Sequence, residues 1–412
     1  MGRVIGLDVS KHSAEVAVLH PGRSSVERSR FAARPEAIRS FAEKLGPDDR
    51  VALESCTNAV AFHRLLCQHA GEVVVSNPLK TRVIAEAKVK TDKVDAEILA
   101  RLLAADFLPA VWVPDPATDH LRHLVFHRLG LVTQRTQAKN RVHAILSRNL
   151  VTTELTDLFG KSGRRFLSRA ELPPGERCLL DADLRVIDFL DQEIFQTNKV
   201  LAELVYEDAD IRLLLTVPGL SMISAVGLKA AIGDIRRFSA SRKLVSYFGL
   251  NPSVYQTGLK AYSGHISRRG RSHARSVCVE VAHQLVKAPG PFHAYFVRLY
   301  RRKPYNVAIT AVARKLVVLT WHMLTRGEAY RYMPPALTRR KLAEMHRLAT
   351  GESVPRTPGR RAPKRAEDKK EGLEAEAQYQ AFISDRFGAQ GPKGIDHPNR
   401  TEPSGRKQKK RT

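Results

Sequence analysis

The sequence predicts an α/β domain at the N-terminus, followed by a mainly α-helical remainder. Residues 3–9, 13–20 and about 24–31 are short apolar runs rich in β-branched residues and separated by turn residues, which is typical of strands. Helical and strand patterns then alternate to about residue 107. From about residue 117, apolar residues recur at three- and four-residue spacing over long stretches, which indicates helices.

Each later element of the first domain has a local signal. Pro35 opens a helix that Gly46-Pro47 ends, Asn58 is in position to cap the next helix, and Asn77-Pro78 stops a strand. The predicted elements are a helix 35–45, a strand 50–53, a helix 59–69, a strand 72–76, a helix near 79–87 and a helix 92–107. This order, three strands and then alternating helices and strands, is that of the ribonuclease H-like fold.

Two long helices, about 117–150 and 179–206, carry many Arg and Gln residues between their apolar positions. Pro173-Pro174-Gly175 is expected to separate them. The pattern predicts a helical hairpin or coiled-coil arm over residues 111–210, suited to dimerisation or to spanning nucleic acid. An ordinary helical domain has the same periodicity.

Residues 211–345 form a third, mainly α predicted domain. Its Pro218-Gly219 turn, followed by Gly227, resembles a helix-hairpin-helix turn, in which backbone amides at a helix N-terminus bind phosphate. A simple helical turn is the alternative. From 346 to 412 the chain is rich in Pro, Gly, Lys and Glu without an apolar period, which predicts a basic, mostly disordered tail.

The composition favours a polyanionic partner. The 412 residues include 68 Lys and Arg against 42 Asp and Glu, a formal net charge of +26 that extends over the folded segments as well as the tail. Neutralising phosphates releases their counterions, so such a chain is suited to nucleic acid. A basic ribosomal or membrane-surface protein is the other class that this charge allows.

The cysteines and the hydropathy indicate a cytoplasmic protein. Cys56, Cys67, Cys178 and Cys278 have no metal-ligand spacing and no paired framework, so we expect reduced thiols in or near the core. Trp112 and Trp321 are also expected in the core. The sequence shows no signal peptide and no uninterrupted apolar run of about 18 residues, so no membrane span is expected.

Four acidic residues in the first hundred positions carry the strongest chemical signal. Asp8 and Glu54 each end a short apolar strand, and Asp92 and Asp95 lie three apart at a helix start, so that both point the same way. Four converging carboxylates repel one another unless a divalent cation neutralises them, which predicts Mg²⁺ or Mn²⁺. Each residue alone could instead cap a turn or helix. Nearby lysines could bind a substrate backbone or be solvated: Lys11, Lys90 and Lys93.

A second group of candidate residues lies between 249 and 275. Hydroxyl residues beside glycines precede a dense basic run, the combination that a loop gripping or attacking phosphate needs. A solvated basic face is the alternative. His265 and His273 are expected to make phosphate or structural contacts. The predicted nucleic-acid-binding residues are Lys260, Arg268, Arg269, Arg271 and Arg275.

These motifs resemble a bacterial insertion-sequence family. The resemblance rests on Ile5-Gly-Leu-Asp-Val-Ser-Lys11, Ala52-Leu-Glu-Ser55, Asn77-Pro78, the segment 90–100, Val217-Pro-Gly-Leu220, Phe248-Gly-Leu-Asn-Pro252, Gln256-Thr-Gly258 and Ile266-Ser-Arg-Arg-Gly270. It covers about residues 1–345, in the family's order. Its members are DEDD (RuvC-like) transposases, some of which are recombinases guided by a bridge RNA.

The resemblance implies a composite active site and several partners. Asp8, Glu54, Asp92 and Asp95 would be the Mg²⁺ ligands, and a serine of the C-terminal transposase domain would attack DNA to form a covalent intermediate. That serine position is Thr257 here; threonine keeps the hydroxyl, but its methyl group stiffens χ1. Ser253 and Ser263 are less favoured by position. The implied partners are DNA, a structured guide RNA and copies of the chain, as dimers that pair into a tetramer.

Other functions remain open on the sequence. A RuvC-type metal-dependent endonuclease would hydrolyse DNA with water and need no nucleophilic hydroxyl. A relic of an insertion sequence would bind nucleic acid without cutting it. The sugar kinase and actin fold also starts with Gly-x-Asp on its first strand, but the downstream phosphate and adenosine motifs are missing from the sequence.

Overall fold

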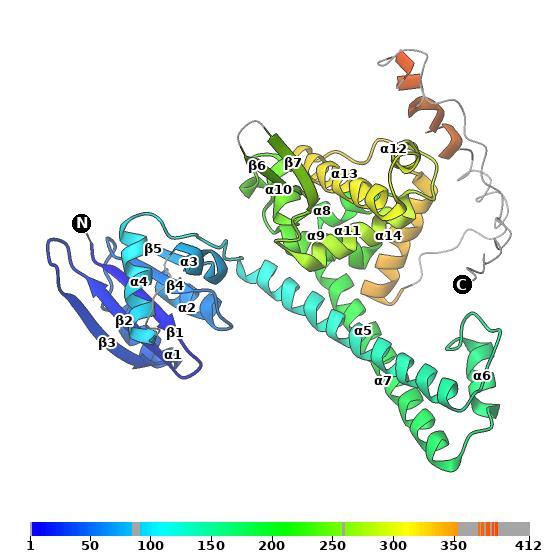
Figure 1. Ribbon diagram of the computed structural model, residues 1–412, viewed down its shortest axis with the longest axis horizontal. Helices are drawn as coiled ribbons and strands as arrows, with labels where there is room; N and C mark the ends of the chain where they lie inside the picture. Colours follow the sequence, from blue (N-terminus) through cyan, green and yellow to red (C-terminus); the bar gives the residue numbers. More distant parts are fainter. Residues whose placement is uncertain are drawn as a thin grey trace, which may run out of the picture. The chain divides into compact units, whose positions relative to one another are not determined.

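The computed structural model describes residues 2–84, 91–257 and 260–352, with residues 370, 372–374, 376–379, 381–382 and 384–385 of the C-terminal segment. The chain divides into two compact units, Met1–Asp115 and Pro116–Thr412 (Figure 1). Most of the predicted tail, together with Lys90, lies outside the described residues.

The first unit contains a five-stranded mixed sheet of order β3-β2-β1-β4-β5. Its strands are β1 (Val4–Val9), β2 (Ser13–Leu19), β3 (Val26–Ala32), β4 (Arg50–Glu54) and β5 (Glu72–Ser76). Strands β1, β2 and β3 form an antiparallel meander, and β4 and β5 continue from β1 in parallel. Parallel neighbours need crossover connections, which the helices between these strands supply.

Helices cover both faces of this sheet (Figure 1). They are α1 (Pro35–Ala42), α2 (Ala59–Leu66), α3 (Pro78–Ile84) and α4 (Asp92–Ala104). Ile5, Leu7 and Leu53 pack with residues of α1 and α2 on one face, while Ala52 packs with Leu99 and Leu103 of α4 on the other. The predicted order of elements is confirmed, as is the ribonuclease H-like character of this unit.

Asp49 fixes the start of β4 against the start of β1. Its buried carboxylate accepts hydrogen bonds from the Arg3 backbone N (2.8 Å), Arg3 Nε (3.2 Å), Arg3 Nη2 (2.5 Å) and the Gly46 backbone N (2.8 Å). Burial raises the pKa of this carboxyl, but these hydrogen bonds outweigh burial and bring it below the ordinary value.

The second unit begins with a helical arm made of α5 (Pro116–Arg148), α6 (Lys161–Arg169) and α7 (Pro174–Val205) (Figure 1). Val142 and Ile145 of α5 share a buried cluster with Leu167 of α6 and Ile187 of α7. The sequence prediction missed α6 and was wrong about the start of α7. Pro174 lies in the first turn of α7, where a missing N–H removes no helical hydrogen bond. The helix therefore begins at residue 174, five residues before the predicted start at 179.

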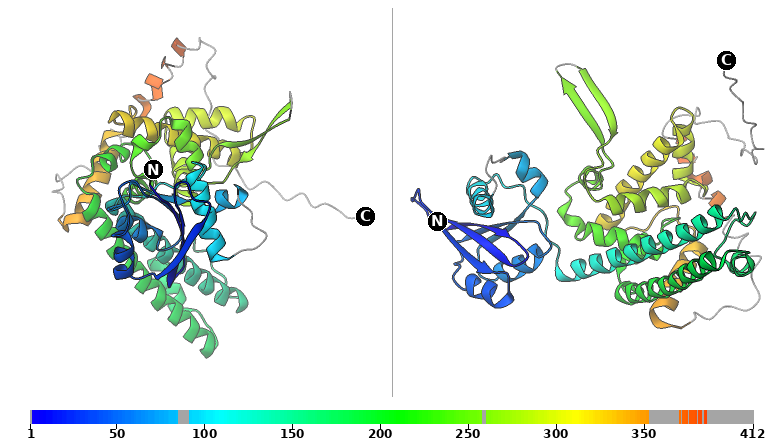
Figure 2. Two further views of the ribbon diagram at one scale, coloured as in Figure 1. Left: turned by 90° about the vertical axis from the view of Figure 1, so that its left-hand side faces the viewer. Right: turned by 60° about the horizontal axis from the view of Figure 1, so that its bottom comes forward.

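The rest of the second unit is a helical body with one β-hairpin. Its helices are α8 (Ala209–Leu214), α9 (Met222–Ile232), the 3-10 turn η1 (Ile235–Arg237), α10 (Ser241–Tyr247), α11 (Ser272–Leu285), α12 (Pro291–Tyr300), α13 (Tyr305–Arg326) and α14 (Pro335–Thr350). The hairpin pairs β6 (Pro252–Thr257) with β7 (Lys260–Ile266) and projects from the helices (Figure 2).

One helix of the described part of the chain, α13, is long and apolar enough to cross a membrane by length and composition. Half of its apolar window is buried, and residues such as Val312 and Leu316 are fully enclosed in the core of the second unit. Trp321, also on α13, packs against this core and donates from Nε1 to the Phe238 carbonyl oxygen (2.9 Å). We therefore interpret α13 as a core helix.

The Pro218-Gly219 turn is packed into the helical body. Its flanking residues Val217 and Leu220 are fully buried, and a Cβ on Gly219 would lie 3.0 Å from Cβ of Gln284 on α11. Lys341 Nζ donates to the carbonyl oxygen of Val217 (2.6 Å) and to that of Leu215 (2.9 Å). This packing favours the simple helical turn over the phosphate-binding alternative.

The cysteine prediction is only partly confirmed. All four thiols are free; Cys278 is buried and Cys56 is half-buried, as expected for core or near-core positions. Cys67 and Cys178 are exposed, so the prediction was wrong for them. Cys67 directly follows the last turn of α2, and Cys178 lies on α7 beside the buried Leu180 stripe rather than in it.

Candidate active site

Asp8 and Glu54 are neighbours at the C-terminal edge of the parallel pair β1–β4. The register joins Leu7 to Leu53, so the next residues, Asp8 and Glu54, stand side by side. Side chains alternate along a strand, which puts both carboxylates on the same face as Gly6 and Ala52. That is the face covered by α4. Both residues are half-buried.

Helix α4 runs antiparallel to these two strands. Asp106, just after the end of α4, forms an ion pair with Arg50 at the start of β4 (2.6 Å between Nη2 and Oδ1). The opposite end of the helix, with Asp92 and Asp95 in its first turn, is therefore directed toward the edge where β1 and β4 end. Thr91 caps this end by accepting from the Val94 backbone N (3.4 Å).

A glycine permits the close approach of α4 to the sheet. A Cβ on Gly6 would lie 1.9 Å from the Ala96 carbonyl oxygen and 2.7 Å from the Ala100 backbone N, distances that a side chain cannot adopt. Only a glycine at this position lets the helix rest on β1. The depth at which α4 sits, and with it the height of Asp92 and Asp95 above the sheet, is set by this contact.

The thiol of Cys56 reports the charge at this edge. Burial raises its pKa, and the negative charges of Glu54 and Asp8 raise it further against the hydrogen bonds from the backbone that follows. Asn58 Nδ2 donates to the Ser10 carbonyl oxygen (3.2 Å) and thereby links the loops that leave β4 and β1. Glu54 and Asp8 therefore both lie close enough to Cys56 for their charges to act on its thiol.

The carboxylates share one edge and one face without closing into a coordination sphere. Among the residues that the structure describes, no group of three or more His, Cys, Asp or Glu side chains is placed to hold a metal ion. Four carboxylates from two strand ends and one helix turn are nevertheless the hard oxygen donors that Mg²⁺ or Mn²⁺ requires. The metal site therefore stays a prediction. Lys11 and Lys93 are exposed beside it.

Thr257 is the last residue of β6, directly before the turn of the hairpin. It is exposed and pairs across the hairpin with Lys260, whose side chain lies outside the described residues, as do Gly258 and that of Ser263. Ser253 is half-buried and donates its hydroxyl to the His265 carbonyl oxygen (2.9 Å), a structural bond. Of the described hydroxyl candidates, Thr257 is the one presented to solvent.

The sequence prediction missed two exposed tyrosines on this hairpin. Tyr255 and Tyr262 are paired directly across the strands and are 69% and 64% exposed. Tyr255 lies two residues from Thr257 and so projects from the same face of the ribbon. The signal in the sequence that could have indicated this cross-strand pair is the seven-residue spacing of the two tyrosines with Gly258 between them.

The predicted arginine cluster divides into two pairs. Arg268 and Arg269 are exposed, as a phosphate-binding role requires. Arg275 instead donates from Nη1 to the Phe248 carbonyl oxygen (3.0 Å), and Arg271 Nε donates to the Tyr247 hydroxyl (2.8 Å), so both link the start of α11 to the end of α10. His265 is exposed and His273 is half-buried.

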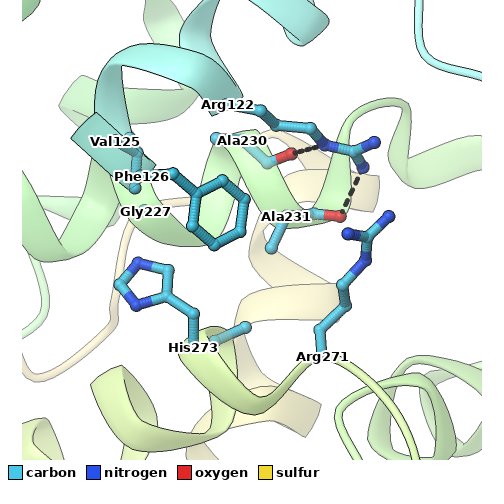
Figure 3. Close-up of a pocket in the computed structure, with 9 residues that line it drawn as sticks. Arg122, Val125, Phe126, Gly227, Ala230, Ala231, Arg271 and His273 are labelled. Carbon is cyan, nitrogen blue, oxygen red and sulfur yellow. Dashed lines mark hydrogen bonds between the residues drawn. The ribbon is translucent and has the colours of Figure 1, made fainter. Parts of the chain in front are cut away.

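A small pocket between α5, α9 and α11 was also missed (Figure 3). Arg122 of α5 and Arg271 lie at one end of it, and Phe126 and His273 at the other. The sequence gave only a weak signal for this pocket. Arg122 is a charged residue on the apolar stripe of a long helix, and Arg271, which lines the same pocket, is about 150 residues away in sequence.

Comparisons with known proteins agree with this architecture. A family model described as "Transposase", of the DEDD type, matches residues 5–150, and one described as "Transposase IS116/IS110/IS902 family" matches residues 211–297. The DEDD nuclease family generally uses divalent metal.

Three curated relatives extend the match over most of the chain. The transposase for insertion sequence element IS1328 of Yersinia enterocolitica is 27% identical over 334 residues, covering 79% of this chain and 98% of the relative. A probable family 20 transposase of Pseudomonas aeruginosa is 28% identical, with 79% and 98% covered. A pilin gene-inverting protein of Moraxella lacunata is 25% identical, with 64% and 75% covered. The chain belongs to the IS110 family of insertion-sequence transposases.

Proposed function

We propose that this transposase is a site-specific DNA recombinase that cuts and rejoins strands by transesterification through Thr257, assisted by a divalent cation at Asp8, Glu54, Asp92 and Asp95. The observation that supports the proposal is that Asp8 and Glu54 end neighbouring strands on the face covered by α4, whose first turn carries Asp92 and Asp95 and which rests on Gly6. A related protein named as a gene-inverting protein supports recombination rather than simple cleavage.

The chain's own residues supply the following steps. Thr257 Oγ1 attacks a phosphorus of the DNA backbone, a threonine phosphodiester forms, and the bond to one deoxyribose oxygen breaks. The hydroxyl proton leaves to a base, and the released deoxyribose oxygen takes up a proton. A second deoxyribose hydroxyl then attacks the same phosphorus and releases Thr257. The number of phosphodiester bonds is conserved, so no external energy source is needed.

The carboxylate edge would serve this exchange electrostatically. A Mg²⁺ or Mn²⁺ ion bound there would stabilise the charge that develops on the phosphoryl oxygens. Asp95 is half-buried and Asp92 is exposed, so Asp92 is the more accessible of the two to solvent. Arg268 and Arg269, which are exposed after β7, would bind the flanking backbone.

Two kinds of partner belong to this proposal. The net charge of +26 supports binding of DNA together with a structured guide RNA. A stripe on α7 is 40–59% exposed and is defined by Leu179, Val186, Phe189 and Val200. Leu179 and Val186 are seven residues apart, and Val186 and Val200 are fourteen residues apart. That spacing supports a coiled coil with a second copy of the arm, and hence a dimer from which a tetramer is built.

A trapped covalent adduct tests the proposal. On a nicked DNA substrate that cannot be religated, the parent and Thr257→Ser should yield a protein–DNA species resistant to denaturant, whereas Thr257→Ala should yield none. Asp8→Asn should abolish strand exchange while binding persists. Ser253→Ala, whose hydroxyl makes a backbone bond, is the control and should keep the adduct. Recombination by Thr257→Ala would refute the nucleophile.

Cleavage without an adduct would favour the second candidate, a RuvC-type endonuclease. The carboxylate edge supports it, because these four residues alone suffice for metal-assisted attack by water. Binding without cleavage in Mg²⁺ or Mn²⁺ would indicate an inactive relic.

A further inference from the structure

The turn between α12 and α13, two helices of the second unit (Figure 1), carries three consecutive cations. Arg301, Arg302 and Lys303 follow the last residue of α12, and Pro304 precedes α13. The backbone N of Arg302 and that of Lys303 both donate to the Leu299 carbonyl oxygen (2.9 and 3.0 Å), so the turn is fastened to the end of α12. All three cationic side chains are exposed, and none of them forms an ion pair with another residue that the structure describes.

The charged residues on either side of this turn in sequence are all basic. Residues 281–327, which run from near the end of α11 to the residue after α13, include eight Lys and Arg and no Asp or Glu. Glu280 on α11 directly precedes this stretch, while Glu328 follows the far end of α13, about 33 Å along the helix from the turn. Such an excess of one sign favours a polyanion, because neutralised phosphates release their counterions.

A stacked aromatic pair lies directly beside these cations. Tyr300, the last residue of α12, stacks on Phe296 with ring centroids 5.4 Å apart and an angle of 13° between the ring planes. Phe296 is buried in the core of the second unit, whereas Tyr300 is 54% exposed. Phe296 therefore covers the inner face of the Tyr300 ring.

Tyr305 lies at the side of this pair. Its ring is nearly perpendicular to both other rings, and its centroid is 5.5 Å from that of Phe296 and 5.9 Å from that of Tyr300. A ring over the outer face of Tyr300 would be much farther from Phe296 than from Tyr300, because Phe296 lies on the inner side. Tyr305 therefore leaves the outer face of Tyr300 uncovered.

The cluster is also fixed before any ligand arrives. The Tyr305 hydroxyl and His283 Nδ1 are hydrogen-bonded at 3.1 Å, and the two rings stack with centroids 5.6 Å apart. Tyr300 is thus supported from below by Phe296 and from the side by Tyr305. A ring held in this way loses little conformational freedom when a ligand stacks on it, which favours binding.

A flat aromatic face next to exposed cations matches an unpaired nucleotide. Proteins that hold single strands stack bases on aromatic rings and bind the flanking phosphates with cations. In a DNA duplex the bases are stacked on one another and offer no free face. A structured RNA exposes unpaired bases in its loops, and these are the parts that proteins usually recognise. The surface is therefore better suited to an RNA loop than to duplex DNA.

We propose that the α12–α13 corner, defined by Tyr300, Arg301, Arg302 and Lys303, binds an unpaired loop of a structured RNA. One base stacks on the outer face of Tyr300, and the three cations bind the flanking phosphates. The proposal rests on the proposed function only for the presence of an RNA partner. A purely structural aromatic cluster would explain the contacts of Phe296, but it would not leave the outermost ring 54% exposed beside three cations without ion pairs.

Two variants of the full-length protein separate stacking from charge. The probe is a synthetic stem-loop RNA with an adenosine-rich loop, titrated by fluorescence anisotropy. Tyr300→Ala should weaken its binding by roughly 5- to 100-fold, the usual range for loss of one stacked base, and leave the salt dependence unchanged. Tyr300→Phe, which keeps the ring, should bind like the parent. The triple variant Arg301→Gln/Arg302→Gln/Lys303→Gln should reduce the slope of log affinity against log salt by about two, since each single-strand phosphate contact contributes about 0.7.

The controls are matched in exposure and in charge. Phe195→Ala removes a phenylalanine that is 49% exposed on α7. Lys161, Arg165 and Arg169 are exposed cations on α6, and changing all three to Gln removes the same amount of charge as the corner triple variant. Both controls should bind the stem-loop like the parent. Equal losses from the α6 and corner triple variants would indicate general electrostatic attraction and overturn the site. Thermal melting establishes that all variants are compared at equal folded fraction.

Other ligands test the assignment to an unpaired RNA loop. Tyr300→Ala should bind a fully paired RNA duplex and a DNA duplex like the parent. Equal weakening with these duplexes, or a loss confined to a DNA stem-loop of the same sequence, would overturn the assignment. Parent-like affinity of Tyr300→Ala for the RNA stem-loop would overturn the stacking site itself.

Failure of the corner is distinct from failure of the recombinase proposal. A covalent adduct through Thr257 together with parent-like RNA binding by the corner variants would refute the corner alone. Weakened RNA binding by these variants without any adduct from the parent would refute the Thr257 chemistry and keep the corner.

Discussion

Replacing Gly6 by alanine should uncouple the two halves of the carboxylate site. The new Cβ would lie 1.9 Å from the Ala96 carbonyl oxygen, whereas ordinary contact begins near 3.4 Å, so α4 has to retreat by 3.4 − 1.9 = 1.5 Å at this point. Ala96 is only one residue beyond Asp95, so the first turn of α4 moves with it. Asp8 and Glu54, which belong to the sheet, stay in place.

The consequences for activity and stability can be measured separately. A misplacement of about 1 Å costs on the order of 100-fold in rate, so strand exchange should fall by about that factor. Overpacking should also cost ~1–3 kcal/mol of stability in the first unit. We expect single-turnover exchange on labelled DNA to show the first effect and calorimetric melting to show the second, with DNA affinity unchanged.

Gly46→Ala is the matched control in the same unit. A Cβ there would meet only Asp49 Oδ2, at an ordinary 3.8 Å, so both the melting temperature and the rate should stay near those of the parent. Alanine is no worse than glycine in a strand, so a loss at Gly6 must come from the helix contact. A Gly6→Ala protein with parent-like melting and exchange would refute the argument that this contact sets the height of α4.

Three other predictions concern stability and assembly. Asp49→Asn should lower the free energy of unfolding by about 2 kcal/mol, since hydrogen bonds to a charged group are lost. Because the pKa of this carboxyl is lowered in the folded state, its contribution to stability is present at neutral pH and disappears as the pH falls below about 4. Urea unfolding of the parent and the variant across pH 3–7 will show this loss. Burial lowers the pKa of Lys341 to about 8. As the pH rises, the folded state therefore loses this proton at a lower pH than the unfolded chain, and the stability should rise between pH 8 and about 10.4. Thermal melts of Lys341→Met should not show this rise. Val186→Asp on the α7 stripe should reduce the mass measured by light scattering to that of the monomer, whereas the control Phe195→Ala should leave it unchanged. An unchanged mass for Val186→Asp would exclude the stripe as the dimer contact.

Local patterns predicted the first unit well because its signals are short-ranged. Strand alternation, Pro35 and Gly46-Pro47 gave element ends within a few residues of those observed. Helix α6 was not predicted because it is short and mostly polar, with only Phe166 and Leu167 as large apolar residues. The start of α7 was misplaced because Pro174 was interpreted as a break, although a proline in the first helical turn is favourable.

For the site, the sequence predicted the carboxylates, because strand ends and a helix start are local features. It could not predict how closely they approach one another, since that depends on the depth of α4 above Gly6. The Arg122–Arg271 pocket depends on tertiary packing between helices that are distant in sequence. No spacing rule identifies such a pair. The Tyr255–Tyr262 pair likewise became visible only through strand register.

The hairpin that carries Thr257 has a consequence for the speed of the proposed exchange. A two-stranded hairpin has little stability of its own, and Thr257 is the exposed last residue of its first strand. Asp8 and Glu54, by contrast, end strands of a five-stranded sheet. If the Thr257 hydroxyl attacks as proposed, ordering it on bound DNA has an entropic cost that falls on the chemical step. Changes that stiffen the hairpin should therefore raise the rate of exchange without raising the affinity for DNA.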